Sequence, residues 1–341
     1  MVRNGTIVVR KIVSKILRSN PLKDPFIRDI IVYLPNGYSL SNSKGYLTVI
    51  GLPSFGSNAK TWLNEDPLKE NMQQKIDRLI SSRRVLPIIF VVVDCFTKLG
   101  GNQYINSGAT GNYEDFIIQE VIPFIKNEYN SSYIVVMGKS SGGYGSFSLA
   151  GNNPALFQGF ISHSGDCGFE YCYFPDFPAA IETLRSSGGV KKWLKVFWSN
   201  TNHDRNKSNQ MKTLNVVAMS AHYSPNAKSE IGFDLPFNYH TGEIIDKVWK
   251  MWQSKDPVRV VDSLKSRLHR LKYMYIDCGA DDEFNLQLGN RALHYKLKKL
   301  GIKHYYEEFD GGHFNTNYRF DKSLELMSSR FSNVSALAQI N

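Results

Sequence analysis

The sequence is poor in cysteine and has no long apolar run. Four cysteines in 341 residues are too few for a disulfide scaffold, and their spacing does not complete a zinc site, so we expect a reducing, cytoplasmic compartment. The longest apolar run, Leu86–Val93, is far shorter than the roughly 20 residues of a membrane helix. Near the N-terminus, Arg10, Lys11 and Lys15 interrupt the stretch that would have to be apolar in a signal peptide. We therefore expect neither a membrane partner nor a secretory leader.

The net charge of +10 raises the question of nucleic-acid binding. No run of adjacent Lys and Arg exceeds two residues, and no nucleic-acid motif is present. A solvated basic surface is therefore the preferred interpretation. With 42% hydrophobic and 21% charged residues, the composition is that of a globular protein and excludes a disordered or collagen-like chain. The length allows one large domain or two smaller ones, and homo-oligomer formation is left open.

Short β-branched runs alternate with amphipathic stretches along most of the chain, a pattern typical of an α/β fold with a mostly parallel central sheet and helices on both faces. The predicted strands are Ile30–Leu34, Tyr46–Leu52, Ile88–Asp94, Tyr133–Met137, Gly159–Ser162, Tyr273–Cys278 and Tyr305–Phe309. Apolar residues at helical spacing predict helices over Tyr113–Tyr129 and Ala292–Leu300, the second of which is followed by Gly301 as a terminator.

The stretch 168–262 breaks this alternation. It is rich in Asn, Ser and Lys, has no convincing buried strand and holds four of the five tryptophans. We expect residues 1–167 and 263–341 to form the core domain, and 168–262 to be a mainly helical insertion. The insertion is interpreted either as a surface excursion with its own small core or as a cap over a site at the carboxyl ends of the strands, and the two interpretations are compatible.

The most informative motif is the G-x-S-x-G sequence centred on Ser140. An apolar strand leads into Gly138, and a helical pattern follows Gly142, which is the strand–turn–helix context of a nucleophile elbow. The turn is so tight that side chains two residues either side of the serine would collide, and glycine removes them. The N–H groups of the following helix point at the same place. Ser140 is therefore the predicted nucleophile.

These glycines have two other possible roles. The Gly-Lys-Ser sequence could end a phosphate-binding loop, but that motif needs a glycine where this chain has Tyr133, so we reject it. The glycines could also serve only to let a helix approach a strand closely. The strand before Ser140 and the helix after it favour the nucleophile.

A serine nucleophile needs a histidine base that a carboxylate orients, and in this kind of fold the acid precedes the histidine in the chain. Asp282 follows one predicted strand, and His313 lies in a glycine-rich loop after the last one. We predict that His313 is the base and that Asp282 is the acid. Asp282 is preferred to its neighbour Asp281, and Asp166 is the alternative from another strand end.

The oxyanion that forms during attack needs two N–H donors. The residue after the nucleophile supplies one, so Ser141 contributes its backbone N–H. The loop after the strand Tyr46–Leu52 supplies the other. Pro53 has no N–H, which leaves Phe55 as first choice and Ser54 as second. A plain surface turn is the alternative interpretation of this loop.

With these residues assigned, the chain resembles the esterase D-type family of α/β-hydrolases, which includes S-formylglutathione hydrolases and mycolyltransferases. The similarity covers about 30–168 and 272–332. It is carried by GKSSGGYG at 138–145, TGNYEDFIIQEVIPFI at 110–125, DCGADDEF at 277–284 and YEEFDGGHF at 306–314. The resemblance implies an α/β-hydrolase fold, the triad Ser140, His313 and Asp282, and the oxyanion donors Phe55 and Ser141. It also implies that Tyr104 and Asn106 line the substrate pocket.

The combined analysis predicts a serine carboxylesterase that acts on a small-molecule ester through an acyl-enzyme, with no metal and no other cofactor. Acyl transfer to an alcohol or sugar, and S-formylglutathione-type thioester hydrolysis, use the same triad and stay open as alternatives. A hypothesis of another class is a non-catalytic binding protein on a hydrolase scaffold. The presence of all three triad residues argues against it.

Overall fold

Eight strands form one sheet in the computed structural model, which describes residues 4–337. Their order is β1-β2-β4-β3-β7-β8-β9-β10. The strands β1 and β2 are antiparallel to their neighbours, and the remaining pairs are parallel. The strands are β1 (Thr6–Val13), β2 (Ile27–Leu34), β3 (Tyr46–Leu52), β4 (Ile88–Val93), β7 (Ser131–Lys139), β8 (Gly159–His163), β9 (Tyr273–Gly279) and β10 (Tyr305–Phe309). A separate short hairpin joins β5 (Asn106–Ser107) to β6 (Gly111–Asn112).

The expected strands are all present, and Tyr46–Leu52 and Tyr305–Phe309 have the expected bounds. The others differ only at their ends. The strand β1 was not expected, because it lies at the antiparallel edge of the sheet and most of its side chains are exposed or half-buried. Without one buried face, its sequence lacks the alternation that marks a strand.

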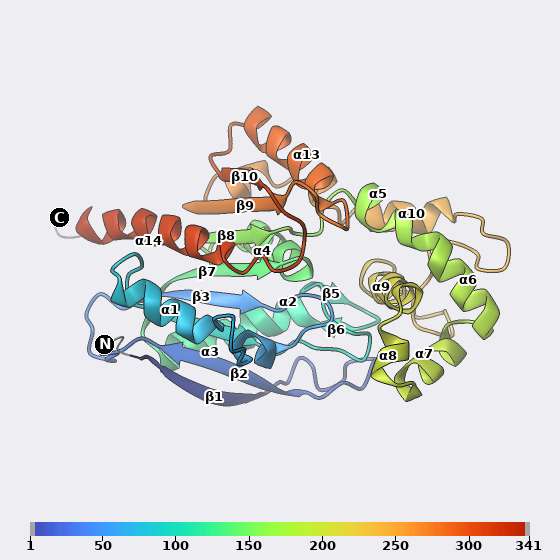
Figure 1. Cartoon of the computed structure of the whole chain (residues 1–341), viewed down its shortest axis with the longest axis horizontal. Coiled ribbons are helices and arrows are strands. Elements are labelled where there is room, and N and C mark those ends of the chain that lie inside the picture. Colours follow the sequence, from blue (N-terminus) through green and yellow to red (C-terminus); the bar gives the residue numbers. More distant parts are fainter. Residues whose placement is uncertain (1–3, 338–341) are drawn as a thin grey trace.

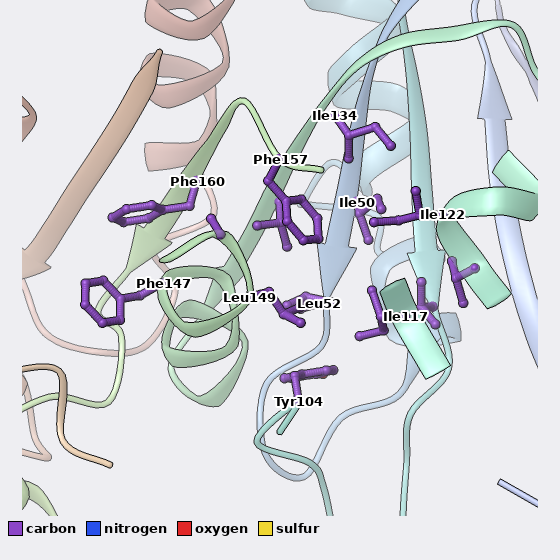
Figure 2. Close-up of a cluster of buried hydrophobic side chains, with 14 of the residues drawn as sticks. Ile50, Leu52, Tyr104, Ile117, Ile122, Ile134, Phe147, Leu149, Phe157 and Phe160 are labelled. Carbon is purple, nitrogen blue, oxygen red and sulfur yellow. The ribbon is translucent and has the colours of Figure 1, made fainter. Parts of the chain in front are cut away.

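Helices cover both faces of the sheet (Figure 1). Successive apolar residues of β3 face these two layers. Val49 belongs to a cluster with α1 (Met72–Ser81) and α14 (Arg319–Leu337), whereas Ile50 packs on the opposite side of the sheet. Figure 2 shows that opposite cluster, in which Ile50 and Leu52 lie near helical side chains such as Ile117, Ile122 and Leu149. Burial of successive residues on opposite faces is what a parallel sheet with two helical layers requires. The helices of this second layer are α3 (Ile122–Glu128), α4 (Ser141–Asn152), α12 (Lys265–Leu268) and α13 (Leu286–Lys299).

The two predicted helices are present with changed bounds. The first begins as α2 (Tyr113–Asp115), continues as a π-helical stretch over Phe116–Val121 and ends with α3, so the expected stripe is wound less tightly in its middle. The second corresponds to α13, which starts at Leu286 rather than at Ala292. A short 3₁₀-helix, η1 (Ala59–Leu63), precedes α1.

The chain between β8 and α12 is helical and contributes a second apolar cluster, which includes Trp193 and Trp252. In Figure 1 most of these helices gather at the side of the molecule toward which β3, β7 and β9 point. They are α5 (Phe169–Cys172), η3 (Phe174–Asp176), α6 (Phe177–Ser187), α7 (Val190–Ser199), α8 (Asn202–Arg205), α9 (Ser208–Tyr223), α10 (Asp246–Gln253) and α11 (Pro257–Val260). Among the helices of residues 4–337, none combines the length and the apolar character needed to cross a bilayer.

Candidate active site

Ser140 lies in the sharp turn between β7 and α4. Its backbone has φ 55° and ψ −124°, a strained conformation for a residue with a side chain. The two flanking glycines allow it: a Cβ on Gly138 would lie 2.3 Å from the carbonyl carbon of Gly142, and a Cβ on Gly142 would lie 2.1 Å from the Leu52 carbonyl oxygen. The strand–turn–helix geometry predicted for the G-x-S-x-G motif is therefore present.

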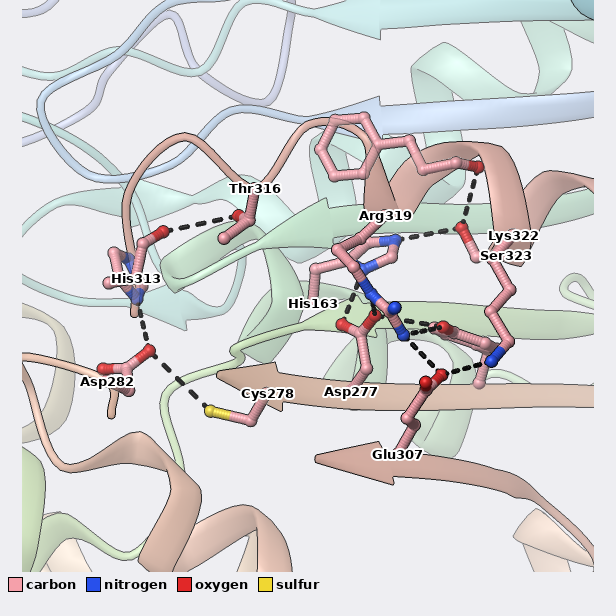
Figure 3. Close-up of polar contacts among 12 residues, drawn as sticks. His163, Asp277, Cys278, Asp282, Glu307, His313, Thr316, Arg319, Lys322 and Ser323 are labelled. Atoms are coloured by element: carbon pink, nitrogen blue, oxygen red, sulfur yellow. Dashed lines mark hydrogen bonds and ion pairs between the residues drawn. The ribbon is translucent and has the colours of Figure 1, made fainter. Parts of the chain in front are cut away.

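His313 and Asp282 are brought together by the loops after β10 and β9. The imidazole Nδ1 lies 2.8 Å from Asp282 Oδ2, and both side chains are buried (Figure 3). The other carboxylate oxygen accepts a hydrogen bond from the Phe284 backbone N–H at 2.9 Å. Burial disfavours the charged carboxylate, but the hydrogen bond and charge of His313 and the Phe284 N–H outweigh it, so the pKa of Asp282 is lowered below 3.8. Asp282 is thus ionised and orients the imidazole.

One cavity of about 530 Å³ holds Ser140 and His313. Its walls come from the loop after β3, from the elbow, from the loops after β9 and β10, and from the helical segment between β8 and α12. The apolar part of the lining includes Phe55, Phe284 and Phe314. Asp176 from η3 and Asn215 from α9 add polar groups. A pocket with a large apolar lining and a few convergent polar groups is typical of a small-molecule site.

The Ser140 hydroxyl donates a hydrogen bond to Asp166 Oδ1 at 3.2 Å, and within residues 4–337 it makes no hydrogen bond to His313. Asp166 follows β8, is buried and also accepts hydrogen bonds from Ser141 Oγ at 3.1 Å and Tyr173 Oη at 2.7 Å. Burial raises the pKa of its carboxyl group, and these donors partly oppose the rise. The alternative acid therefore contacts the serine, not the histidine.

The candidate oxyanion donors lie at the same cavity. Phe55, Ser54 and Ser141 all line it, and in the described part of the chain their backbone N–H groups donate to no protein acceptor. Ser141 is the first residue of α4, where an N–H has no partner within the helix. These N–H groups are thus available to a ligand oxygen.

The structure does not bring Tyr104 and Asn106 to this cavity. The chain turns at Tyr104, whose φ is 58°, and its buried hydroxyl donates to the Pro53 carbonyl oxygen at 2.5 Å. Asn106 lies in the hairpin strand β5, and its Oδ1 accepts from the Asp115 N–H at 3.1 Å. Tyr104 thus supports the loop of Phe55 from behind, and Asn106 holds the start of a helix. Similarity of motif could not reveal these directions, because they depend on the turn at 104.

A second Ser–His–Asp arrangement lies away from the cavity. His163 Nδ1 is 2.7 Å from Asp277 Oδ1, and its Nε2 is 3.0 Å from Ser323 Oγ (Figure 3). Arg319 also contacts Asp277 through Nε at 3.0 Å. Ser323 and Asp277 are fully buried, so no substrate reaches them. This network joins α14 to the ends of β8 and β9, and no local sequence pattern marks it.

Metal ligands do not cluster in the described part of the chain, where no group of three or more His, Cys, Asp or Glu side chains is placed to hold an ion. The four cysteines are buried and unpaired.

Several known proteins are similar to this chain. A family model described as "Putative esterase" matches residues 27–331. No curated protein sequence matches the chain. Among solved structures, a ferulic acid esterase is 17% identical, with 96% of this chain and 100% of that chain covered and a TM-score of 0.59. The fluorophosphonate-binding serine hydrolase F of Staphylococcus aureus is 14% identical, with 96% and 99% covered and a TM-score of 0.58. The S-formylglutathione hydrolase of S. aureus is 14% identical, with 96% and 98% covered and a TM-score of 0.55.

Proposed function

Because the chain belongs to the esterase family whose model spans residues 27–331, it is an ester-hydrolysing enzyme, and we propose that it is a serine carboxylesterase acting through Ser140, His313 and Asp282. The membership confirms the resemblance seen in the sequence motifs, and the mostly parallel sheet with two helical layers confirms the expected α/β-hydrolase fold. The observation that carries the proposal is a strained serine and a carboxylate-bound histidine on one cavity.

In the proposed reaction, rotation about the Cα–Cβ bond of Ser140 turns its hydroxyl from Asp166 toward His313 Nε2. Hydrogen bonds of this kind are often long or absent before substrate binds. The serine oxygen then attacks the ester carbonyl while His313 takes its proton. Asp282 keeps the Nδ1 proton in place and stabilises the imidazolium that forms.

The negative oxygen of the tetrahedral intermediate is placed between the backbone N–H groups of Phe55 and Ser141. Such donors are already oriented before the reaction, so their stabilisation needs no rearrangement during it. His313 next protonates the leaving alcohol, and an acyl-enzyme on Ser140 remains. Water then attacks the acyl carbonyl while His313 takes its proton, and His313 returns that proton to the Ser140 oxygen as the acid is released.

We propose that residues 168–262 form a cap over this site. The support is that Tyr173, Asp176 and Asn215, all from this helical segment, line the cavity together with Ser140. The cytoplasmic location expected from the cysteine content also stays a proposal. Four buried, unpaired thiols are compatible with a reducing compartment.

The test is hydrolysis of p-nitrophenyl esters with short acyl chains by purified wild-type and variant enzymes. We expect Ser140→Ala to lower kcat by about 10⁶, the loss typical of a serine nucleophile. Ser323→Ala is the matched control, since it removes the serine of the buried arrangement and should keep esterase activity. A folded Ser140→Ala variant that works at near the wild-type rate would refute the proposal. Products formed in the presence of a competing alcohol will distinguish hydrolysis from acyl transfer.

A further inference from the structure

A second cavity lies next to the catalytic one. It encloses about 300 Å³ and is lined by the segment from Ser54 to Lys75, by residues at the start of α14, and by Lys139. Ser54 and Lys139 line both cavities, so the two share a wall. The Ser54 hydroxyl donates to the Lys139 carbonyl oxygen at 3.0 Å and fixes this wall. Lys139 therefore lies at the boundary between the catalytic cavity and the second cavity.

The charged groups around this second cavity are mostly paired with each other. The Lys75 ammonium lies 2.6 Å from Asp321 and 3.6 Å from Glu70. Glu70 also binds Arg78, at 2.6 Å. The exposed Lys69 donates a hydrogen bond to the side-chain oxygen of Asn315. Asp66, an exposed carboxylate, also lines the second cavity. These groups leave little charge free for a ligand.

Lys139 is different. It is half-buried, and among the described residues its ammonium group has neither an ion pair nor a hydrogen bond. Burial lowers the pKa of this ammonium, although Asp282 and Glu283 partly oppose the change. Both carboxylates are already engaged with His313, Asp282 through Nδ1 and Glu283 through the backbone N–H. A partly buried ammonium group with no protein partner is open to an anionic ligand.

We propose that the second cavity is an anion subsite of the esterase, and that Lys139 selects esters carrying a carboxylate or a similar anionic group away from the scissile bond. This inference rests on the function proposed above, because it assigns the substrate class of the same site. Lys139 is the last residue of β7 and directly precedes the nucleophile, so its backbone is held beside Ser140. An anionic ester would be oriented by one contact in the second cavity while its carbonyl lies at Ser140.

The experiment compares matched ester pairs in which one member carries a carboxylate and the other its neutral methyl ester, and it follows release of the phenol. For an anion on the alcohol side, the pair is 4-acetoxybenzoate and its methyl ester. For an anion on the acyl side, the pair is monophenyl adipate and methyl phenyl adipate. The quantity measured is the ratio of kcat/KM for the anionic and the neutral member of each pair. Intrinsic reactivity cancels when the same ratio is compared between enzymes.

We expect Lys139→Met to lower this ratio about 10- to 100-fold for at least one pair, as expected for a lost charge-assisted contact. The pair that responds shows which half of the substrate enters the second cavity. Lys139→Arg keeps the charge and should keep most of the preference. Lys60→Met is the matched control, because it removes an exposed lysine from nearby η1 that does not line either cavity. Its ratio should equal that of the wild type.

Folding of each variant is checked by thermal unfolding, and Lys139→Gln replaces Lys139→Met if the latter does not fold. An unchanged ratio in a folded neutral variant, with neutral esters still cleaved through Ser140, would overturn the anion subsite and leave the esterase proposal intact. Failure of wild-type enzyme to cleave any of the four esters would instead count against the proposed function itself.

Discussion

Replacing Asp282 by asparagine tests how the histidine is oriented. In the native site, the ionised carboxylate accepts a hydrogen bond from His313 Nδ1 across 2.8 Å, in a buried position. An asparagine amide fits the same space, but its N–H group can donate to Nδ1 and hold the proton on Nε2. The imidazole would then present a donor to Ser140 where the reaction needs an acceptor.

The expected loss follows from this change of tautomer and from the missing negative charge beside the imidazolium. We expect kcat for p-nitrophenyl acetate to fall by about 10⁴, which corresponds to about 5 kcal/mol of transition-state stabilisation. The matched control is Asp281→Asn, since Asp281 is exposed and its side chain makes no hydrogen bond within residues 4–337. The control should retain activity close to wild type.

The assay is steady-state hydrolysis under saturating ester, with thermal unfolding to confirm that both variants are folded. A folded Asp282→Asn enzyme with kcat within tenfold of wild type would refute the orientation role. Loss of activity in Asp281→Asn but not in Asp282→Asn would assign the acid to the neighbouring residue.

Three further predictions concern buried residues that support the fold. Gly142→Ala places a methyl group 2.1 Å from the Leu52 carbonyl oxygen, so the free energy of unfolding, measured by thermal unfolding, should fall by about 1–3 kcal/mol and activity should be low. Gly108→Ala is the control and should behave like wild type, because its added Cβ would meet nothing closer than 3.8 Å. Tyr104→Phe removes the donor to the Pro53 carbonyl, so stability should fall by about 1 kcal/mol and kcat severalfold, and an unchanged kcat would show that this contact does not hold the oxyanion loop. Burial lowers the pKa of His222 from 6.5 to about 3, so between these pH values the unfolded chain binds a proton that the folded chain does not. Stability should therefore fall by up to about 1.4 kcal/mol per pH unit as the pH drops from 6.5 toward 3. His222→Gln lacks this proton uptake, so its melting temperature should depend less on pH between 7 and 4, and equal pH dependence of the two proteins would contradict the assignment.

The strands and the elbow could be predicted because their signals are local. A run of β-branched residues buried on both faces, such as β3, can be recognised without knowing its neighbours, and the glycines around Ser140 follow from the geometry of a single turn. The placement of acid and histidine on one edge then follows from the parallel sheet, and their order in the chain is that of the fold class.

Contacts between distant segments could not be predicted in this way. The sequence indicates Asp166 only as an alternative acid for His313. Its hydrogen bonds to Ser140 and Tyr173 could not be predicted, because they depend on how the helical segment packs on the sheet. The direction of Tyr104 depends on a backbone turn with positive φ at a residue type that rarely adopts it. That the Lys139 ammonium has no ion pair within residues 4–337 becomes clear only when the surrounding ion pairs are known.

The central claim is that Ser140 is the nucleophile, and covalent labelling tests it most directly. The wild-type enzyme is incubated with a fluorophosphonate probe, digested, and the modified residue identified by peptide mass spectrometry. We expect one adduct on Ser140, abolished in Ser140→Ala and unaffected in Ser323→Ala. An adduct on another serine, or undiminished labelling of Ser140→Ala, would contradict the account.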